Sequence, residues 1–203
     1  MNLDKVKTKD NNRLFPVFLK LEHLRLLIVG GGYVGFEKLN TVLQNSPATH
    51  ISVIATQISP SVNELAAGFK NVTLKERSFK VEDLDGIDIV IIAINDTSLS
   101  GSIYQEARKK GKLVNVADTP DLCDFYLGAI VSKGNLKIGI STNGKSPTIA
   151  KRIREMLNET LPDQLDVVLD NMQIIRNRLK GNFQDKVRQL NDLTSILVEK
   201  NEA

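Results

Sequence analysis

"LRLLIVGGGYVGFEKLN" (residues 24–40) passes from an apolar run through three successive glycines into an amphipathic segment. Four apolar residues in a row, Leu26 to Val29, predict a strand that is buried on both faces. Apolar side chains at helical spacing follow at Val34, Leu39 and Val42, and they predict a helix. A glycine turn between a buried strand and a helix is typical of the first unit of a parallel α/β sheet.

The glycines of this turn fit the pattern GxGxxG at Gly30, Gly32 and Gly35. In such a unit the first glycine permits the tight turn, the second lets a pyrophosphate approach the backbone, and the third lets helix and strand pack closely. The phosphates then bind the free N–H groups at the start of the helix. The pattern predicts a dinucleotide site, and a glycine turn with a purely structural role is the alternative.

Strands and helices are expected to alternate through the first part of the chain. After the first strand, the expected strands are residues 50–55, 72–79, 88–94 and 112–118, and the expected helices are 59–69 and 98–111. Ser59 is expected to cap its helix, with Pro60 at the first helical position. This alternation predicts an α/β fold, a Rossmann-type doubly wound parallel sheet.

A different pattern begins at residue 125. Two apolar runs flank "SKGN" (residues 132–135), which is too short for a crossover helix and therefore predicts an antiparallel hairpin. The residues beyond the hairpin have helical spacing, with Pro162 ending the first helix and Gly181 separating two more. We expect three structural parts, at residues 13–118, 119–145 and 146–203.

The end of the second strand bears on the choice of cofactor. Many NAD sites place an Asp or Glu there for the ribose hydroxyls, whereas this chain has Thr56 and Gln57. These two residues and backbone groups must then contact the ribose, and no arginine stands there to accept a 2′-phosphate. The pattern favours NAD over NADP. Asn95 follows the fourth strand at the same sheet edge and is expected to contact the cofactor.

A second motif, "GISTNGKS" (residues 139–146), matches the P-loop pattern of ATP sites. Its first glycine falls inside an expected strand, and Ser146 followed by Pro147 has the form of a helix N-cap with proline at the next position. Two other interpretations stay open. The hydroxyls and the lysine of the motif could bind an anion together with the helix N-terminus, or the loop could be a capped helix start with solvated side chains.

Asp118 ends the fifth expected strand, within "VNVADTPDLCDF" (residues 114–125). Open α/β sheets bind ligands at the carboxyl edge of their strands, so a carboxylate there is placed to accept a proton beside a hydride-transfer position. The alternative is a turn-forming role before a Thr-Pro pair. His23 and His50 flank strands at the opposite end, and we expect no metal ligand or catalytic base from them.

The composition indicates a globular protein whose mildly basic charge suits a small anionic molecule as well as it suits nucleic acid. Its 203 residues carry a net charge of +3, and an aromatic content of 5% without tryptophan offers little stacking surface for nucleic acid. A single cysteine, Cys123, excludes an internal disulfide and fits a reducing compartment. We expect a cytoplasmic protein, because no apolar run approaches the roughly 20 residues of a membrane helix and the first residues lack the core of a signal peptide.

Taken in order, these segments resemble the precorrin-2 dehydrogenase family, the NAD-dependent enzymes of sirohaem synthesis. The shared motifs are "FPVFLKL", "LLIVGGGYVGFEK", "VNVAD", "LCDF" and "ISTNGKSP", in the family's order and spacing, over residues 14–160. The last motif, at a junction of hairpin and helix, is the most specific. It also argues against the P-loop interpretation.

The resemblance implies a homodimer with a Rossmann domain, a dimerisation region and a helical domain, acting on the tetrapyrrole precorrin-2 with Asp118 as catalytic residue. The implied cofactor contacts are Gly30, Gly32, Tyr33, Val34, Gly35, Thr56 and Gln57, and the implied substrate contacts are Ser141, Thr142, Asn143, Gly144 and Lys145. Some family members also insert Fe²⁺ into sirohydrochlorin, and the sequence leaves that activity open. A non-catalytic NAD(H)-binding regulatory module is the alternative from a different class.

Overall fold

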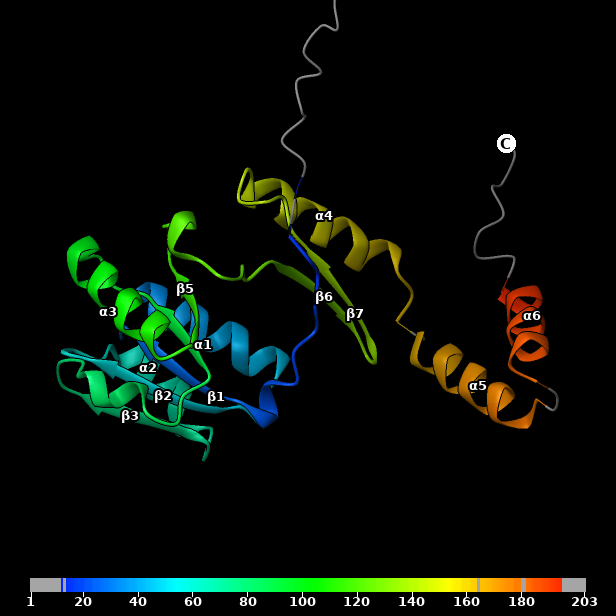
Figure 1. The fold of residues 1–203 in the computed structure, drawn as a ribbon. Coiled ribbons are helices and arrows are strands. Elements are labelled where there is room, and N and C mark those ends of the chain that lie inside the picture. Colours follow the sequence, from blue (N-terminus) through cyan, green and yellow to red (C-terminus); the bar gives the residue numbers. More distant parts are fainter. Residues whose placement is uncertain (1–11, 13, 164, 180–181, 195–203) are drawn as a thin grey trace, which may run out of the picture. The chain divides into compact units, whose positions relative to one another are not determined.

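The chain folds into two compact units. A computed structural model describes residues 12, 14–163, 165–179 and 182–194. The first unit ends at Leu127 and the second begins at Gly128 (Figure 1). The expected three-part division stays a prediction, whereas the boundary between the two units falls directly before the hairpin.

The first unit is built on a parallel sheet with the strand order β3-β2-β1-β4-β5 (Figure 1). The strands are β1 (Arg25–Val29), β2 (His50–Ala55), β3 (Val72–Glu76), β4 (Ile89–Ile92) and β5 (Leu113–Val116). The chain moves outward from β1 to β3 and then crosses back to begin β4 on the other side of β1. This is the doubly wound parallel arrangement that the sequence predicts.

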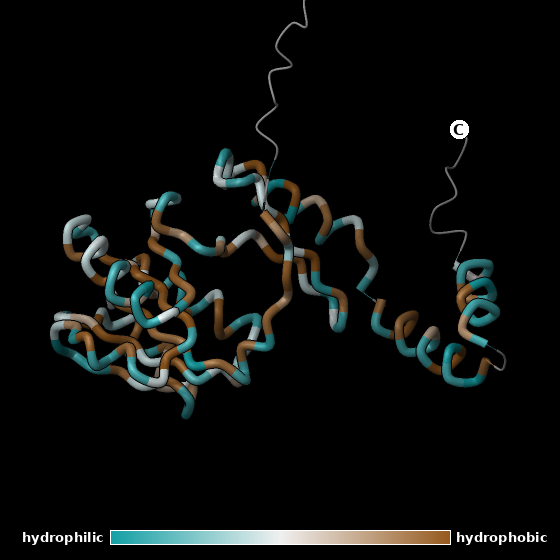
Figure 2. Tube along the Cα trace, in the orientation of Figure 1, coloured by the Kyte–Doolittle hydropathy of each residue, from teal (hydrophilic) through white to brown (hydrophobic). Residues whose placement is uncertain are grey.

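Helices cover both faces of this sheet. They are α1 (Tyr33–Asn45), α2 (Pro60–Ala67) and α3 (Thr97–Lys109), with the short 3-10 turns η1 (Leu21–His23), η2 (Val81–Leu84) and η3 (Pro120–Leu122). In β1, Leu26 and Ile28 pack with residues of α1 and α2, whereas Leu27 and Val29 pack with residues of α3. Burial on both faces explains the continuous apolar run, and Figure 2 shows the apolar residues between the layers.

Capping side chains fix where two of these helices begin. The predicted cap on α2 is confirmed, since the Ser59 hydroxyl accepts the Val62 N–H and Pro60 is the first helical residue. The third helix begins at Thr97, one residue earlier than expected, because Asp96 Oδ1 accepts the Leu99 N–H at 2.9 Å. Strands β3, β4 and β5 are shorter than predicted. Strand β3 lacks residues 77–79 at its carboxyl end, whereas β4 and β5 each lack one predicted residue at the amino end and two at the carboxyl end.

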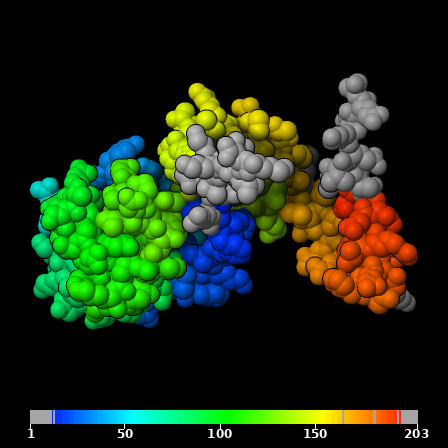
Figure 3. Space-filling view, turned by 45° about the horizontal axis from the view of Figure 1, so that its top comes forward, coloured from blue at the N-terminus to red at the C-terminus, as the bar shows by residue number. Residues whose placement is uncertain are grey.

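The second unit contains the predicted hairpin, with antiparallel strands β6 (Ala129–Lys133) and β7 (Leu136–Ile140). The helices α4 (Pro147–Thr160), α5 (Leu165–Arg178) and α6 (Phe183–Thr194) follow. Helix α4 packs on the hairpin, where Val131 is fully buried, and α5 contacts α6 (Figure 3). Gly181, expected to separate the last two helices, lies outside the described residues. No helix in the described part of the chain is long and apolar enough to span a membrane.

The hairpin turn is attached to the segment that begins α5. Gly134 has a φ of 55°, a value that favours glycine. The next N–H, from Asn135, donates to Asp166 Oδ1 at 2.6 Å, and Lys133 forms an ion pair with Asp163. The Lys133 ammonium lowers the pKa of the Asp163 carboxyl. These contacts connect the first and later parts of the second unit.

Candidate functional site

The turn after β1 lies against three neighbouring pieces of backbone. Gly30 has a φ of 128°, and its N–H donates to the Ile54 carbonyl at 2.9 Å. A Cβ on Gly30 would overlap the Ala93 carbonyl at the end of β4, and a Cβ on Gly35 would overlap the Gly30 carbonyl. Gly30 and Gly35 therefore have the structural roles expected for the first and third glycines of the pattern.

The middle glycine of the three was not singled out by the sequence pattern. A Cβ on Gly31 would lie 2.6 Å from the Gln57 carbonyl oxygen and 2.9 Å from the Ala55 Cβ. The Gly31 carbonyl also accepts the Ser59 N–H at 2.9 Å. Gly31 therefore holds the turn against the loop after β2. The run of three glycines, where the pattern needs only two, is the signal for this extra contact.

The backbone is open at the start of α1. Gly32 is the N-cap of this helix, no side chain caps it, and a Cβ there would have nothing within 4 Å. By contrast, side chains of Ser59, Asp96 and Ser146 cap the helices α2, α3 and α4. The uncapped N–H groups of α1 carry the positive end of the helix dipole. Such a helix start binds phosphate oxygens, which is the role expected of the second glycine.

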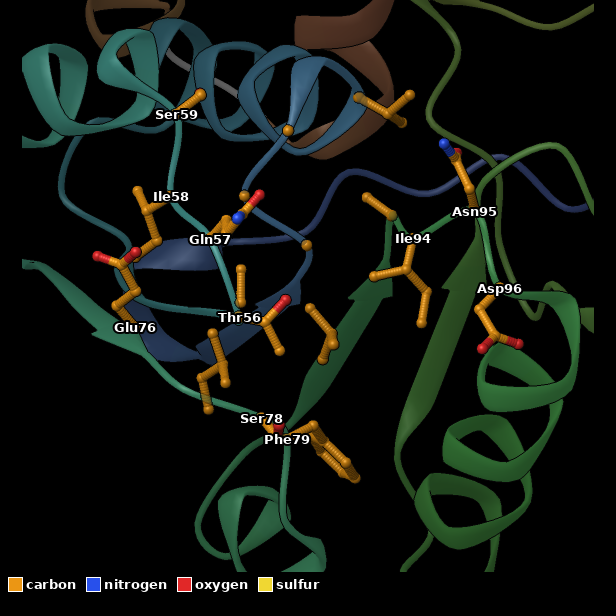
Figure 4. Close-up of a pocket in the computed structure, with 18 of the residues that line it drawn as sticks. Thr56, Gln57, Ile58, Ser59, Glu76, Ser78, Phe79, Ile94, Asn95 and Asp96 are labelled. Carbon is orange, nitrogen blue, oxygen red and sulfur yellow. The ribbon is translucent and has the colours of Figure 1, made fainter.

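A cavity of about 1070 Å³ lies at the carboxyl edge of the sheet, around this helix start. It is lined by the loops that follow β1, β2, β3 and β4 (Figure 4). Of the residues expected to contact the cofactor, those that line it are Gly30, Gly32, Tyr33, Val34, Thr56, Gln57 and Asn95. Gly35 does not line it and acts beneath the turn. The volume suits an extended ligand such as a dinucleotide.

The end of β3 supplies lining residues that sequence reasoning missed. Glu76, Ser78 and Phe79 line the cavity (Figure 4). Their place there follows from the pairing of β2 with β3, which sets Ala55 beside Glu76. Strand order is a property of the tertiary fold, so local pattern gave no signal for them.

Asp118 lines a second, smaller cavity of about 230 Å³. The two cavities adjoin, because they share the lining residues Val34, Ala93, Ile94 and Asn95. These residues lie where β1 and β4 end side by side and the chain turns toward opposite faces of the sheet. Doubly wound sheets bind ligands at this switch point. The structure thus brings Asp118 next to the predicted dinucleotide site.

The backbone of Asp118 is left-handed, with a φ of 58°, and its side chain is exposed. This conformation costs most L-residues about 1–2 kcal/mol, and Asp and Asn adopt it most readily after glycine. The next residue closes the turn, since the Thr119 N–H donates to the Val116 carbonyl at 3.3 Å. Asp118 therefore has both the turn geometry of the structural interpretation and the cleft position of the catalytic one.

The turn that holds Asp118 is attached to β5 by Cys123. The Cys123 Sγ accepts the Val116 N–H at 3.3 Å and lies 3.2 Å from the Val116 carbonyl and 3.3 Å from the Thr119 carbonyl, toward which its S–H can point. Burial raises the pKa of the Cys123 thiol, which keeps it protonated and able to donate. The single cysteine therefore has a structural role on both sides of Asp118.

Residues 124 and 125 extend this attachment along the strand. Asp124 Oδ2 accepts the Val114 N–H at 2.9 Å, and its other oxygen pairs with Arg108 at 2.8 Å. The buried Asn115 side chain donates to the Phe125 carbonyl at 2.8 Å. The motifs "VNVAD" and "LCDF" are thus two halves of one hydrogen-bonded structure.

The loop before α4 has the capped-helix geometry that the sequence favoured over a P-loop. Gly139 lies inside β7, and the Ser146 hydroxyl accepts the Ile149 N–H at 3.2 Å. Thr142 Oγ1 accepts the Ser146 N–H at 3.2 Å and lies 3.0 Å from the Ser146 carbonyl. The Thr142 hydroxyl therefore braces the loop, which limits its use in binding an anion.

Other groups of this loop face solvent. Ser141 Oγ accepts the Asn143 N–H at 3.1 Å, and this leaves the Ser141 hydroxyl hydrogen free to donate. Asn143 and Gly144 are left-handed, with φ values of 55° and 73°. The Lys145 side chain is exposed, and its ammonium has no ion pair with the residues that the structure describes. These four residues belong to the second unit, whereas Asp118 belongs to the first.

Metal binding by a cluster of side chains has no candidate in the described ranges. Within residues 12–194, apart from the few positions not described, no three His, Cys, Asp or Glu side chains come together in a way that could hold an ion.

Two family profiles match the chain in succession. The first, described as "Putative NAD(P)-binding", matches residues 17–129, and the second, the central part of sirohaem biosynthesis proteins, matches residues 133–160. The solved structure of SirC, a precorrin-2 dehydrogenase, is similar over 89% of both chains, with a TM-score of 0.70 and 28% identity.

Curated relatives are also proteins of siroheme biosynthesis. A siroheme synthase of Methylococcus capsulatus is 34% identical over 86% of this chain, and the siroheme biosynthesis protein met8 of Schizosaccharomyces pombe is 37% identical over 77% of it. The chain spans 34% of the length of the first relative and 59% of the second. The family match agrees with the predicted dinucleotide-binding domain.

The glycine turn gives the first testable prediction. Gly30→Ala should lower the free energy of unfolding by at least about 2 kcal/mol, because its Cβ meets the Ala93 carbonyl and its φ is positive. Gly101→Ala is the matched control in α3, where a Cβ meets nothing within 4 Å, and should raise stability by about 0.5–1 kcal/mol. Denaturant unfolding measures both. Equal stabilities for Gly30→Ala and the unmodified chain would contradict the close approach.

Proposed function

The chain belongs to the NAD(P)-binding family of sirohaem biosynthesis proteins, and we propose that it catalyses the NAD-dependent dehydrogenation of precorrin-2 to sirohydrochlorin in the cytoplasm. The observation that carries this proposal is the junction of the two cavities at the ends of β1 and β4. There, an uncapped helix start suited to a pyrophosphate lies beside the exposed Asp118 carboxylate, which makes no hydrogen bond or ion pair with the residues that the structure describes.

Different residues of the first unit bind the cofactor and accept the proton in the proposed reaction. The N–H groups at the start of α1 hold the pyrophosphate, and Gly30 and Gly31 keep the turn low enough for it to approach. Bound NAD⁺ supplies the hydride acceptor. Dehydrogenation also releases a proton, and Asp118 accepts it from the substrate before passing it to solvent. Help of this kind from a general base contributes about 10² to 10⁴ in rate.

The substrate carboxylates have candidate partners in the second unit. Lys145 carries an exposed positive charge, and the Ser141 hydroxyl has a free hydrogen to donate. The backbone N–H groups of Asn143 and Gly144 lie in left-handed turns of the same loop. Thr142 supports this loop through Ser146 instead of binding substrate directly.

A regulatory module that binds NAD(H) without turnover is the competing function. Such a module has no use for an exposed carboxylate at the switch point or for the loop of residues 141–145. NADH formation from NAD⁺ and freshly generated precorrin-2, followed by absorbance, separates the two. A protein that binds NAD⁺ yet adds nothing to the spontaneous rate would be the regulatory module.

Asp118→Asn should reduce kcat for precorrin-2 dehydrogenation by about 10²-fold or more while the NAD⁺ dissociation constant stays unchanged. Asn keeps the left-handed backbone accessible, so the variant separates loss of the base from damage to the turn. Asp121→Asn, an exposed neighbour in η3, is the control. Unchanged kcat in Asp118→Asn would remove the carboxylate from the mechanism.

Supplying sirohydrochlorin and Fe²⁺ anaerobically to the same proteins tests the iron insertion that the family resemblance leaves open.

Lys145→Gln should raise KM for precorrin-2 by about twofold to fivefold, the size expected when one exposed ion pair is lost. The effect should shrink as salt is added, because screening weakens the same attraction. Lys151→Gln changes a nearby exposed lysine that pairs with Glu155, and should leave KM unchanged. A KM effect of equal size in both variants would indicate general charge attraction in place of a specific contact.

We expect a homodimer formed through the hairpin. Helix α4 covers the face of β6 and β7 that contains Val131 and Ile138, and each strand of this two-stranded sheet keeps one edge without a strand neighbour in the described chain. An isolated two-stranded sheet is marginally stable, so a second copy would stabilise the hairpin. Sedimentation at low micromolar concentration should give twice the chain mass. A species of 22.5 kDa would contradict the dimer.

A further inference from the structure

Many NAD sites carry a carboxylate at the end of the second strand, and in this chain a carboxylate lies instead at the end of the neighbouring strand. In this chain β2 is followed by Thr56 and Gln57, and neither is acidic. Glu76 is the last residue of β3 and is paired in register with Ala55, directly before Thr56. Parallel strands lie about 4.8 Å apart, so the two positions are one strand spacing from each other at the same sheet edge.

The register also determines the side on which Glu76 projects. Paired residues of neighbouring strands point to the same face of a sheet. The Ala55 Cβ lies 2.9 Å from the position that a Cβ on Gly31 would take, so this face is the one that carries the glycine turn. In agreement, Glu76 lines the large cavity (Figure 4).

The cations nearest in sequence are not available to this end of the cavity. Lys75 precedes Glu76 in the strand and therefore projects to the opposite face. The Arg77 guanidinium is held by Asp83, with Nη1 to Oδ2 at 2.7 Å and Nη2 to Oδ1 at 2.5 Å, and it also donates to the Ser78 carbonyl at 2.9 Å. The hydrogen bond from Arg77 lowers the pKa of the Asp83 carboxyl, which keeps the pair charged.

Glu76 itself has no such partner. Its side chain is exposed, and it takes part in no hydrogen bond or ion pair with the residues for which the structure gives positions. A free carboxylate accepts hydrogen bonds from two vicinal hydroxyls. It also repels a phosphate placed at the same position, and like charges set against each other in an interface lower affinity for the wrong partner.

We propose that Glu76 determines cofactor specificity, accepting hydrogen bonds from the adenosine ribose hydroxyls of NAD and excluding the 2′-phosphate of NADP. This inference rests on the proposed function, because it requires a dinucleotide in the large cavity. It assigns the role that the end of β2 lacks to a residue of β3. Thr56 and Gln57 then complete the ribose site from the adjacent loop.

Calorimetric titration of the full chain with NAD⁺ and with NADP⁺ tests the assignment by binding alone. The unmodified protein should bind NAD⁺ more tightly than NADP⁺. Glu76→Gln should lower the ratio of the NADP⁺ dissociation constant to the NAD⁺ dissociation constant by about tenfold, which corresponds to about 1.4 kcal/mol. Glu76→Asp keeps the charge and should retain the preference for NAD⁺. Glu64→Gln removes an exposed carboxylate from α2, outside the cavity lining, and should leave the ratio unchanged.

The outcomes separate this assignment from the function on which it rests. If the protein binds NAD⁺ and Glu76→Gln keeps the original ratio, the specificity assignment is wrong and the proposed function stands. If the unmodified protein binds neither dinucleotide, the proposed function fails and the assignment fails with it. Thermal unfolding of each variant checks that the fold is retained, as expected for an exposed position at a strand end.

Discussion

The approach of the Gly30 backbone to the Ala93 carbonyl sets the arrangement of the whole first unit at its ligand edge. No side chain fits between the end of β1 and the end of β4, and none fits between the turn and Gly35 in α1. The start of α1 is therefore held low over the sheet, at the point where the chain crosses from one face to the other. Both cavities open at this point, and their shared residues come from α1 and from the segment after β4.

The four helices differ in whether a side chain caps the first turn. A side-chain cap contributes about 1 kcal/mol, and Ser59, Asp96 and Ser146 provide one for α2, α3 and α4. Gly32 provides none for α1, although the first residues of this helix line the cavity of about 1070 Å³. A bound phosphate satisfies the same N–H groups that a cap would. Ligand binding would consequently stabilise the folded state, by an amount that grows with the logarithm of the ligand concentration over its dissociation constant.

The local sequence pattern was sufficient to predict the strands, the hairpin and part of the candidate site. Continuous apolar runs, helical spacing and turn residues predict the five parallel strands, the hairpin and the capped start of α4, because each depends on neighbours in sequence. The spacing of Gly30, Gly32 and Gly35 predicts the turn for the same reason. Glu76 could not be found in this way, because its position beside Ala55 depends on the pairing of two strands separated by a helix.

The loop hydroxyls show a second limit of sequence reasoning. Ser141 and Thr142 look equivalent in the motif, yet Thr142 bonds to both backbone groups of Ser146 whereas Ser141 keeps its hydrogen free. The difference arises from the left-handed turn at Asn143 and Gly144, which brings residue 146 back toward residue 142. Chemical type alone does not separate a bracing group from a binding group.

At Asp118 the structural and the chemical interpretation select the same residue. A φ of 58° restricts the position to glycine, asparagine or aspartate at low cost, and Cys123 fixes the turn from both sides through Val116 and Thr119. Of the three permitted residues, only aspartate carries a carboxylate. A turn-forming role would be met equally well by asparagine, so the exposed carboxylate at the switch point is the feature that turn geometry leaves unexplained. The proton transfer proposed for Asp118 would account for it.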